Sequence, residues 1–214
     1  MINKSLKMQP HGMPGRLITF CGLDGCGKST MIKMLKEELT KEGYDVLITK
    51  QPTDAVRRAD IFRNFMDSPD HSLYQYRALS LMAAADRVQH VNKVILPALK
   101  EGRIVLCDRY VYSCLANLRA RGFCDDEWIY EVAKKEIADP DLALFLDVPV
   151  ALALDRVQSR PEEKDRYVDV ELQFRLRDEY RNIAMLNHGI MLSSDDVPEH
   201  TYQRIINLVG GLLK

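Results

Sequence analysis

The chain has 214 residues, of which 30 are basic, 31 are acidic and 46% are hydrophobic. This length suits one α/β domain with a sizeable core. The nearly balanced charge gives no reason to expect a nucleic-acid polymer or an anionic membrane as partner, and no apolar run reaches the ~20 residues that span a bilayer. The N-terminus lacks an apolar signal core and the five cysteines form no metal-like pairs, so the sequence predicts a cytoplasmic protein with free thiols.

Residues 1–15 precede the first apolar run and carry Pro10, Gly12, Pro14 and Gly15. Prolines and glycines at this density interrupt helices and strands. The sequence therefore predicts a disordered N-terminal extension over residues 1–15, followed by a single domain over residues 16–214. No repeat, low-complexity segment or linker divides that domain further.

Apolar runs alternate with segments of helical periodicity along the rest of the chain. The predicted strands lie at residues 17–21, 46–49, 104–107, 142–147 and 190–192. The predicted helices lie at residues 28–42, 73–100, 113–120, 126–138, 150–159, 170–186 and 199–213. Because the strands are continuous apolar runs, they favour a mostly parallel sheet with helices on both faces. The repeated strand–helix order predicts a doubly wound five-stranded α/β sheet that binds ligands at the carboxyl ends of its strands.

A glycine-rich segment after the first strand matches the phosphate-binding pattern G-x-x-x-x-G-K-[ST] with Gly22-Leu23-Asp24-Gly25-Cys26-Gly27-Lys28-Ser29. The glycines let successive backbone N–H groups point at one anion, with the positive end of the next helix behind them. Lys28 would reach the β- and γ-phosphates, and the Ser29 hydroxyl would bind Mg²⁺. A plain glycine turn would not need a Lys-Ser pair at this spacing. The segment therefore predicts a P-loop that binds a nucleoside triphosphate.

A charged cluster, Asp108-Arg109-Tyr110, comes directly after the predicted strand at residues 104–107. A parallel sheet delivers such side chains to the same edge as the P-loop. Asp108 would hold Mg²⁺ or its water, and Arg109 would bind a phosphate through its paired N–H groups. The alternative is a structural Asp–Arg pair that caps the following helix.

Two further charged segments have both a structural and a functional interpretation. Asp86 and Arg87 interrupt an otherwise apolar helix, and such a pair is typical of a solvated surface. Residues 156–166 are dense in charge and lie between two predicted helices. Such runs are usually solvated, but in a phosphoryl transferase a mobile lid of arginines expels water and neutralises the transition state. We therefore predict a short mobile lid over about residues 156–168.

From Arg16 to the C-terminus, the sequence resembles the thymidylate kinase family, whose members move the γ-phosphoryl group of ATP onto dTMP. The motifs that carry the resemblance are Gly22 to Thr30, Lys50-Gln51-Pro52, Asp86-Arg87, Asp108-Arg109-Tyr110 with Ser113 and Ala116, Pro140-Asp141-Leu142, Leu146-Asp147-Val148-Pro149, and Asp165-Arg166 followed by Phe174, Arg177 and Tyr180. The resemblance implies a P-loop kinase domain over residues 16–214, Mg²⁺ as cofactor, ATP as phosphoryl donor, a nucleoside monophosphate as partner and a homodimer.

The resemblance also implies a role for each matching residue. Asp24 would meet the ribose 3′-hydroxyl of the acceptor, Arg109 its 5′-phosphate and Arg87 its base edge. The implied acceptor site comprises Asp24, Pro52, Ala83, Arg87, Arg109, Cys114 and Asn117. The implied ATP site comprises Gly22, Gly25, Cys26, Gly27, Lys28, Ser29, Thr30 and Arg156. The implied catalytic residues are Lys28, Asp108, Arg109 and Arg160, the lid residues are Arg160, Asp165 and Arg166, and the metal ligands are Ser29 and Asp108.

Some relatives carry a catalytic arginine in the P-loop, where this chain has Gly25. Other relatives supply that arginine from the lid, and Arg160, with Arg156 and Arg166 beside it, resembles the second type. A transferring phosphoryl group needs a positive partner from one source or the other. Residues 194–198 are a candidate for contacts with adenine.

Several positions depart from the family pattern, among them Leu118, where the family usually has Gln. Ala83 stands where the family commonly has a Phe that stacks on thymine, and Asn117 stands where it usually has a Tyr that helps to reject a ribose. Gln51 replaces the acidic residue of the commoner Arg-Glu-Pro-Gly loop. A stacking platform is worth about 1–3 kcal/mol per base. Its candidate replacements in this chain are Tyr74, Tyr76 and Tyr112.

The sequence leaves three functions open, of which an ATP:dTMP kinase is preferred. The second is the same phosphoryl transfer onto a ribonucleotide or a modified pyrimidine nucleotide, which Ala83 and Asn117 suggest. The third is a nucleotide-dependent switch without significant catalysis. A GTP-dependent switch would be expected to carry Asn-Lys-x-Asp, and the nearest match, Asn92-Lys93-Val94-Ile95, lacks the carboxylate.

Overall fold

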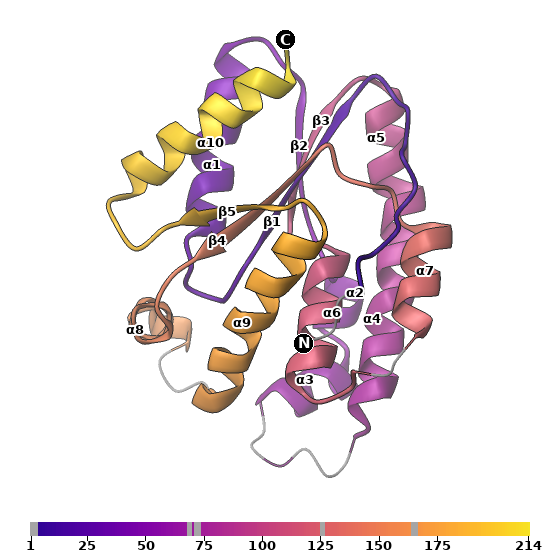
Figure 1. The fold of residues 1–214 in the computed structure, drawn as a ribbon, viewed down its shortest axis with the longest axis vertical. Helices are drawn as coiled ribbons and strands as arrows, with labels where there is room; N and C mark the ends of the chain where they lie inside the picture. The colour runs from indigo at the N-terminus through magenta and orange to yellow at the C-terminus, as the bar shows by residue number, and fades with distance from the viewer. Residues whose placement is uncertain (1–3, 68–69, 71–73, 125–126, 164–166) are drawn as a thin grey trace.

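The computed structural model describes residues 4–67, 70, 74–124, 127–163 and 167–214, and its five strands form one parallel sheet (Figure 1). The strands are β1 (Arg16–Cys21), β2 (Val46–Lys50), β3 (Ile104–Asp108), β4 (Leu142–Asp147) and β5 (Ile190–Ser193). Their order across the sheet is β2-β3-β1-β4-β5, and every neighbouring pair runs parallel. This arrangement confirms the predicted doubly wound α/β P-loop fold.

The burial of each strand follows its place in the sheet. The central strands β1, β3 and β4 are buried along almost their whole length, whereas the edge strands β2 and β5 are partly exposed. Continuous apolar sequence is what a strand covered on both faces requires. Strands β2 and β3 lie on one side of β1, and β4 and β5 lie on the other, so the strand order reverses beside β1. An open α/β sheet binds its ligands at the carboxyl ends of the strands at such a reversal, and the carboxyl end of β1 lies there.

Helices cover both faces of the sheet. They are α1 (Lys28–Lys41), α2 (Asp54–Arg57), α3 (Asp60–Asp67), α4 (Tyr76–His90), the π-helical η1 (Val91–Ile95), α5 (Leu96–Lys100), α6 (Val111–Ala120), α7 (Trp128–Glu136), α8 (Val150–Gln158), the 3₁₀ turn η2 (Pro161–Glu163), α9 (Val170–Leu186) and α10 (Pro198–Leu212). Helices α1 and α10 pack together on one face, and α4, α6 and α9 lie on the other (Figure 1). Within the described residues, no helix has the length and apolar character to cross a membrane.

Helices α2 and α3 were not predicted. Helix α2 has only four residues, and it begins where the Thr53 hydroxyl accepts a hydrogen bond from the Ala55 N–H at 3.3 Å. This side chain satisfies a donor that a helix start leaves free. Helix α3 buries Phe65 against α4 through contact with Tyr76. Both helices are too short to be predicted from helical periodicity.

The helix predicted at residues 73–100 is interrupted near its end. Residues 74 and 75 are not helical, and α4 begins at Tyr76. Residues 91–95 widen into the π-helical η1, where the Leu96 N–H donates to the carbonyl of Val91. Pro97 follows in the first turn of α5. Because proline lacks an N–H and its ring crowds the preceding turn, the regular α-helical ladder cannot continue through this point.

The N-terminal segment is packed against the domain. Leu6 is buried, and Gln9 forms a parallel β-bridge with Ala138. The Gln9 N–H donates to the Ile137 carbonyl at 3.1 Å, and the Gln9 carbonyl accepts from the Asp139 N–H at 2.8 Å. The prediction of a disordered extension is therefore wrong for residues 4–15, and residues 1–3 lie outside the described residues. Prolines and glycines mark breaks in regular structure, but they do not prevent an extended segment from burying its apolar side chains.

Candidate active site

The P-loop links β1 to α1 through glycines in left-handed backbone conformations. Gly22, Gly25 and Gly27 have φ angles of 134°, 82° and 95°. A methyl group at Gly25 would also overlap the carbonyl oxygen of Ala153 in α8. Only glycine combines this backbone with so close an approach. The loop therefore has the curled shape that the motif predicts, and it rests against α8.

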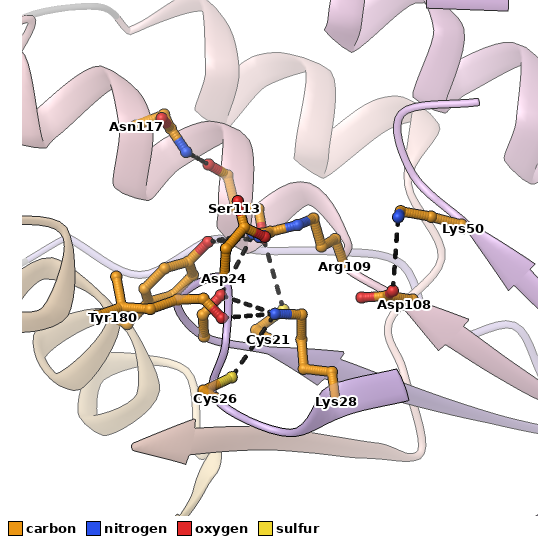
Figure 2. Close-up of polar contacts among 12 residues, drawn as sticks. Cys21, Asp24, Cys26, Lys28, Lys50, Asp108, Arg109, Ser113, Asn117 and Tyr180 are labelled. Carbon is orange, nitrogen blue, oxygen red and sulfur yellow. Dashed lines mark hydrogen bonds and ion pairs between the residues drawn. The ribbon is translucent and has the colours of Figure 1, made fainter. Parts of the chain in front are cut away.

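Lys28 is the buried cation of the loop. Its ammonium group donates to the carbonyls of Leu23 at 2.7 Å and Gly22 at 3.2 Å, and it lies 3.6 Å from the Sγ atom of Cys26 (Figure 2). Only 6% of Lys28 is exposed. The contacts fold the lysine back over the loop, where an anion cradled by the backbone N–H groups would meet its charge.

Asp108 and Ser29 fit the requirements of a magnesium site. Asp108 ends β3, and its Oδ1 atom is buried without a hydrogen-bond partner in the described part of the chain. Its other oxygen lies 3.9 Å from the Lys50 ammonium. Ser29 is exposed in the first turn of α1, next to Thr30. A free carboxylate oxygen and a free hydroxyl near a phosphate loop are the ligands that Mg²⁺ uses with nucleotides.

Lys50 was not among the predicted site residues. Its pKa is lowered because burial disfavours the charged ammonium, although the neighbouring Asp108 opposes that effect. Lys50 ends β2, and Asp108 ends β3 in direct register with it. The parallel register of two strands is therefore what brings this ion pair to the edge of the site.

Arg109 connects the P-loop to the acceptor side. Its backbone is in the left-handed region, with φ of 67°, and its guanidinium binds Asp24 at 2.5 Å, Tyr180 at 2.9 Å and the Gly22 carbonyl at 3.3 Å (Figure 2). Burial opposes its charge, but Asp24, Tyr180 and Asp108 together outweigh burial and raise the pKa of Arg109. Arg109 therefore points into the site as a permanent cation, and the interpretation of Asp108–Arg109 as a helix-capping pair is wrong.

Tyr180 positions Arg109 from the far side. Its hydroxyl donates to the Ser113 Oγ atom at 3.0 Å while it accepts from Arg109 (Figure 2). Tyr180 lies on α9 and Ser113 on α6, two helices that pack against each other. Neither residue was in the predicted site, although both belong to the motifs that carry the family resemblance.

A cavity of about 540 Å³ extends from the P-loop between the helices. Every predicted acceptor residue lines it, together with Arg160 of the predicted lid. These lining residues are Asp24, Pro52, Ala83, Arg87, Arg109, Cys114, Asn117 and Arg160. A volume of this size is typical of a small-molecule site. The structure therefore brings together residues that are as much as 136 positions apart in the sequence.

Arg87 faces this cavity rather than bulk solvent. It is 3% exposed, and it donates to the carbonyls of Ala83 at 2.8 Å and Tyr110 at 3.4 Å. Asp86 turns the other way and accepts from the Thr53 N–H at 2.7 Å. The interpretation of Asp86 and Arg87 as a solvated surface pair is therefore wrong.

The loop that carries Pro52 is held from helix α4. His90 binds Gln51 at 3.0 Å and Thr49 at 2.6 Å, while Asp86 holds Thr53. Burial lowers the pKa of His90. The Gln51–Pro52 peptide bond is cis. Gln51, which departs from the family pattern, therefore has a neutral buried partner that suits an amide.

The aromatic side chains near Ala83 differ in their access to the cavity. Tyr76, Phe62 and Phe65 line it. Tyr112 is 1% exposed and packs against Phe145 in the core, and the Tyr74 hydroxyl accepts from Asn64 at 3.3 Å. Of the three predicted replacements for the missing Phe, only Tyr76 is in place to meet an acceptor.

Arg156 belongs to α8, so the predicted lid begins inside a helix. Its guanidinium binds the carbonyls of Ser194 at 3.0 Å and Gly25 at 3.4 Å. The Ser194 hydroxyl in turn donates to the Cys26 carbonyl at 2.8 Å. These bonds place the candidate adenine loop at residues 194–198 against the P-loop. Asp165 and Arg166 of the predicted lid lie outside the described residues.

Asp147 fastens the end of β4 to α9. Arg177 binds both of its carboxylate oxygens, at 2.7 and 2.9 Å, and Arg181 binds it at 2.7 Å. Burial acts to raise the pKa of Asp147, but the hydrogen bonds from the two arginines outweigh it, and the pKa is lowered. The Asp147 carbonyl also accepts from the Ser194 N–H at 2.9 Å. The cluster thus supports the loop at residues 194–198 beside the P-loop.

Comparison with known proteins identifies the family. The sequence profile of the thymidylate kinase family matches residues 20–205. A probable thymidylate kinase of Pyrococcus horikoshii is 43% identical over 174 residues, which cover 80% of this chain and 84% of that protein. A probable thymidylate kinase of Pyrococcus abyssi is 37% identical, and the match covers 92% of this chain and 97% of that protein. A thymidylate kinase of Afipia carboxidovorans is 42% identical, and the match covers 81% of this chain and 78% of that protein. The chain belongs to the thymidylate kinase family.

Proposed function

We propose that this chain transfers the γ-phosphoryl group of ATP to dTMP and releases dTDP and ADP. One observation carries the proposal: the Lys28 ammonium and the Arg109 guanidinium both bind the carbonyl oxygen of Gly22, at 3.2 and 3.3 Å. The cation of the P-loop and the cation of the acceptor cavity therefore meet at one atom. A triphosphate held by the first and a monophosphate held by the second would touch end to end.

In the proposed reaction, the acceptor phosphate attacks the γ-phosphorus in line. Lys28 and Arg109 hold the two phosphates, and Asp24 receives the 3′-hydroxyl of the acceptor sugar. Arg160 approaches from the lid and neutralises charge on the loose transition state. No side-chain base is needed because a phosphate monoester is largely ionised near neutral pH.

Mg²⁺ is part of this proposal. Ser29 and Asp108 would hold it, and it would neutralise charge on the ATP phosphates. Among the described residues, no cluster of three or more His, Cys, Asp or Glu side chains suits a metal ion by itself. The nucleotide phosphates would therefore complete the coordination of the ion.

The acceptor is proposed to be dTMP rather than a ribonucleotide. Supporting this choice, the relatives that match most of the chain carry the name thymidylate kinase. The experiment is an ADP-release assay with ATP, Mg²⁺ and a panel of dTMP, dUMP, dCMP, dGMP, UMP and CMP. Turnover of UMP or CMP that matches dTMP would overturn the assignment of the acceptor. A complete lack of ADP with every monophosphate would overturn the kinase proposal itself.

We also propose a cytoplasmic homodimer. In support, the four buried cysteines at positions 21, 26, 107 and 114 are free thiols, as a reducing compartment favours. Leu81 on α4 is 50% exposed between the exposed Ala78 and Ala85, which gives this helix an apolar outer face. Analytical ultracentrifugation should find a dimer that Leu81→Glu converts to a monomer.

A further inference from the structure

One face of α4 lines the acceptor cavity from end to end. Tyr76, Ala83 and Arg87 lie seven and four residues apart, a spacing that places side chains on the same side of a helix. At 1.5 Å per residue, the Cα atoms of Tyr76 and Arg87 are about 16 Å apart along the axis. Leu79, Ser80 and Ala83 of α4 also line the cavity between them, and Ala83 has the smallest side chain of the three. The space beside Ala83 is where a planar base would lie.

Arg121 occupies the Tyr76 end of this space. It follows the last residue of α6, and its guanidinium lies 4.3 Å from the centre of the Tyr76 ring and 6.0 Å from that of Phe65. A guanidinium over an aromatic face is attracted by the ring quadrupole. Arg121 also lines the cavity. The cation is therefore held at the wall rather than free to swing into solvent.

Asn117 fixes the orientation of Arg121. The Asn117 amide donates through Nδ2 to the Ser113 carbonyl at 2.9 Å, which leaves Oδ1 to accept from Arg121 Nη1 at 2.7 Å. Ser113 is in turn bound by Tyr180, which holds Arg109. One chain of hydrogen bonds thus joins the guanidinium at the phosphate end to the guanidinium at the base end.

Both arginines keep donors for a ligand. In the described part of the chain, neither Arg87 Nη2 nor Arg121 Nε and Nη2 has a hydrogen-bond partner. A guanidinium can only donate. Among the exocyclic groups of a pyrimidine, its matching partner is a carbonyl oxygen, whereas an amino group would place N–H against N–H. Thymine and uracil carry carbonyls at two positions, and cytosine replaces one of them with an amino group.

We infer that Arg121, positioned by Asn117 and Tyr76, contacts the acceptor base and selects bases with two carbonyl groups over bases with an amino group. The inference rests on the proposed kinase function and names a determinant of its acceptor specificity. Arg87 supplies donors from one end of the space over Ala83, and Arg121 supplies them from the other. A site built to donate hydrogen bonds discriminates strongly because an unmatched buried donor loses its partner.

The test compares Arg121→Met with a matched control, Arg77→Met. Arg77 also lies over an aromatic ring of the same cluster, 5.1 Å from the centre of Phe123, but it does not line the cavity. For each protein, kcat and KM are measured with dTMP and with dCMP, and the thermal unfolding midpoint is recorded. Arg121→Lys, which keeps the charge but loses the planar group, is measured alongside.

Arg121→Met should raise the KM for dTMP about tenfold or more, with kcat within about threefold, and should reduce the preference for dTMP over dCMP about tenfold. Arg77→Met should leave all these values within about twofold, and Arg121→Lys should fall between the two. Equal KM values and equal preferences for Arg121→Met and Arg77→Met would overturn the inference. A loss confined to kcat would also overturn it, because base contact acts on binding.

Two further outcomes are decided by the same design. If Arg121→Met does not fold, the result for Arg121→Lys decides: an unchanged KM and preference would overturn the inference, and an intermediate loss would support it. If the unmodified protein releases no ADP, the proposed function fails on its own. Calorimetric titration of dTMP and dCMP into the unmodified protein and Arg121→Met then tests base selection by binding alone.

Discussion

The two ends of the cavity are built in different ways. At the phosphate end, the P-loop and the carboxyl ends of β2 and β3 place Lys28, Lys50, Asp108 and Arg109, and many of the contacts are to backbone carbonyls. At the base end, helices α3, α4 and α6 contribute single side chains that touch one another, such as Tyr76, Phe65 and Arg121. Backbone geometry defines the first end, and side-chain packing defines the second.

This difference separates the chemistry from the choice of substrate. The phosphate end depends on consecutive residues and strand register, so few sequences can replace it. The base end depends on which side chains meet across helices, and it can change while the chemistry stays. Substitutions at the phosphate end should therefore act on kcat, and substitutions at the base end should act on KM.

The largest effect is expected for Lys28→Met. Removing the ammonium should lower kcat about a thousandfold or more, because the charge of the transferring phosphoryl group loses its partner in the P-loop. ADP release at saturating dTMP is the measurement. Lys33→Met is the control, since Lys33 is exposed on the same helix. A Lys28→Met protein with the same kcat as its control would contradict the claim that the phosphate end determines kcat.

Arg160→Ala should have the next largest effect. Arg160 lines the cavity from the lid side, and loss of a transition-state arginine should lower kcat about a thousandfold. The dissociation constant of dTMP, measured by calorimetry, should change by less than about threefold. The exposed Arg204 on α10 provides the control substitution to Ala. Equal losses in kcat and in dTMP affinity would show that Arg160 only holds the substrate.

Arg87→Met tests the base end. The KM for dTMP should rise about 10- to 100-fold, because one hydrogen-bonded contact to a base edge is worth about 1–3 kcal/mol. Steady-state kinetics should show kcat within about threefold of the unmodified protein. Urea unfolding should accompany the assay, since Arg87 also binds the carbonyls of Ala83 and Tyr110. A large loss of kcat at unchanged stability would show that Arg87 acts in the chemical step, and it would contradict the assignment of kcat to the phosphate end alone.

The smallest effect is expected for Asp147→Asn, and it concerns stability. The folded-state pKa of Asp147 is lowered, so its ion pairs stabilise the fold at pH values above the ordinary pKa of an Asp and are lost as pH falls through the lowered value. At pH 7 the substitution should reduce the free energy of unfolding by about 1–3 kcal/mol. Urea unfolding should show this difference shrinking as the pH falls through the lowered pKa of Asp147. A difference that does not change with pH would show that the charge of Asp147 is not what stabilises β4 against α9.

The phosphate end could be predicted from the sequence because its causes are local. The glycine pattern specifies the curled backbone at Gly22, and continuous apolar runs specify the central parallel strands. The apolar run that precedes Arg109 likewise predicts its position at the end of a strand. Its contact with Tyr180 could not be derived in this way, because the two residues are 71 positions apart and meet only when α6 and α9 pack.

Arg121 of the base end and the order of the N-terminal segment escaped prediction for a related reason. Arg121 has no motif around it, and its role depends on the neighbouring Tyr76 ring and the Asn117 amide. The segment at residues 4–15 contains glycines and prolines that are typical of loops, yet its order comes from Leu6 in the core and from pairing with residues near Ala138. Helical periodicity likewise does not report the π-helical widening before Pro97.

The contact between Gly25 and Ala153 bears on how ATP is protected from water. No side chain fits at position 25 unless α8 shifts, so this position of the P-loop cannot hold a guanidinium beside the γ-phosphate. If the missing charge comes from Arg160, it comes from the segment that follows α8. Bound ATP would then wait in an unreactive state until that segment closes over a second nucleotide. The close packing of the turn at Gly25 against α8 would in this way suppress hydrolysis of ATP in the absence of the acceptor.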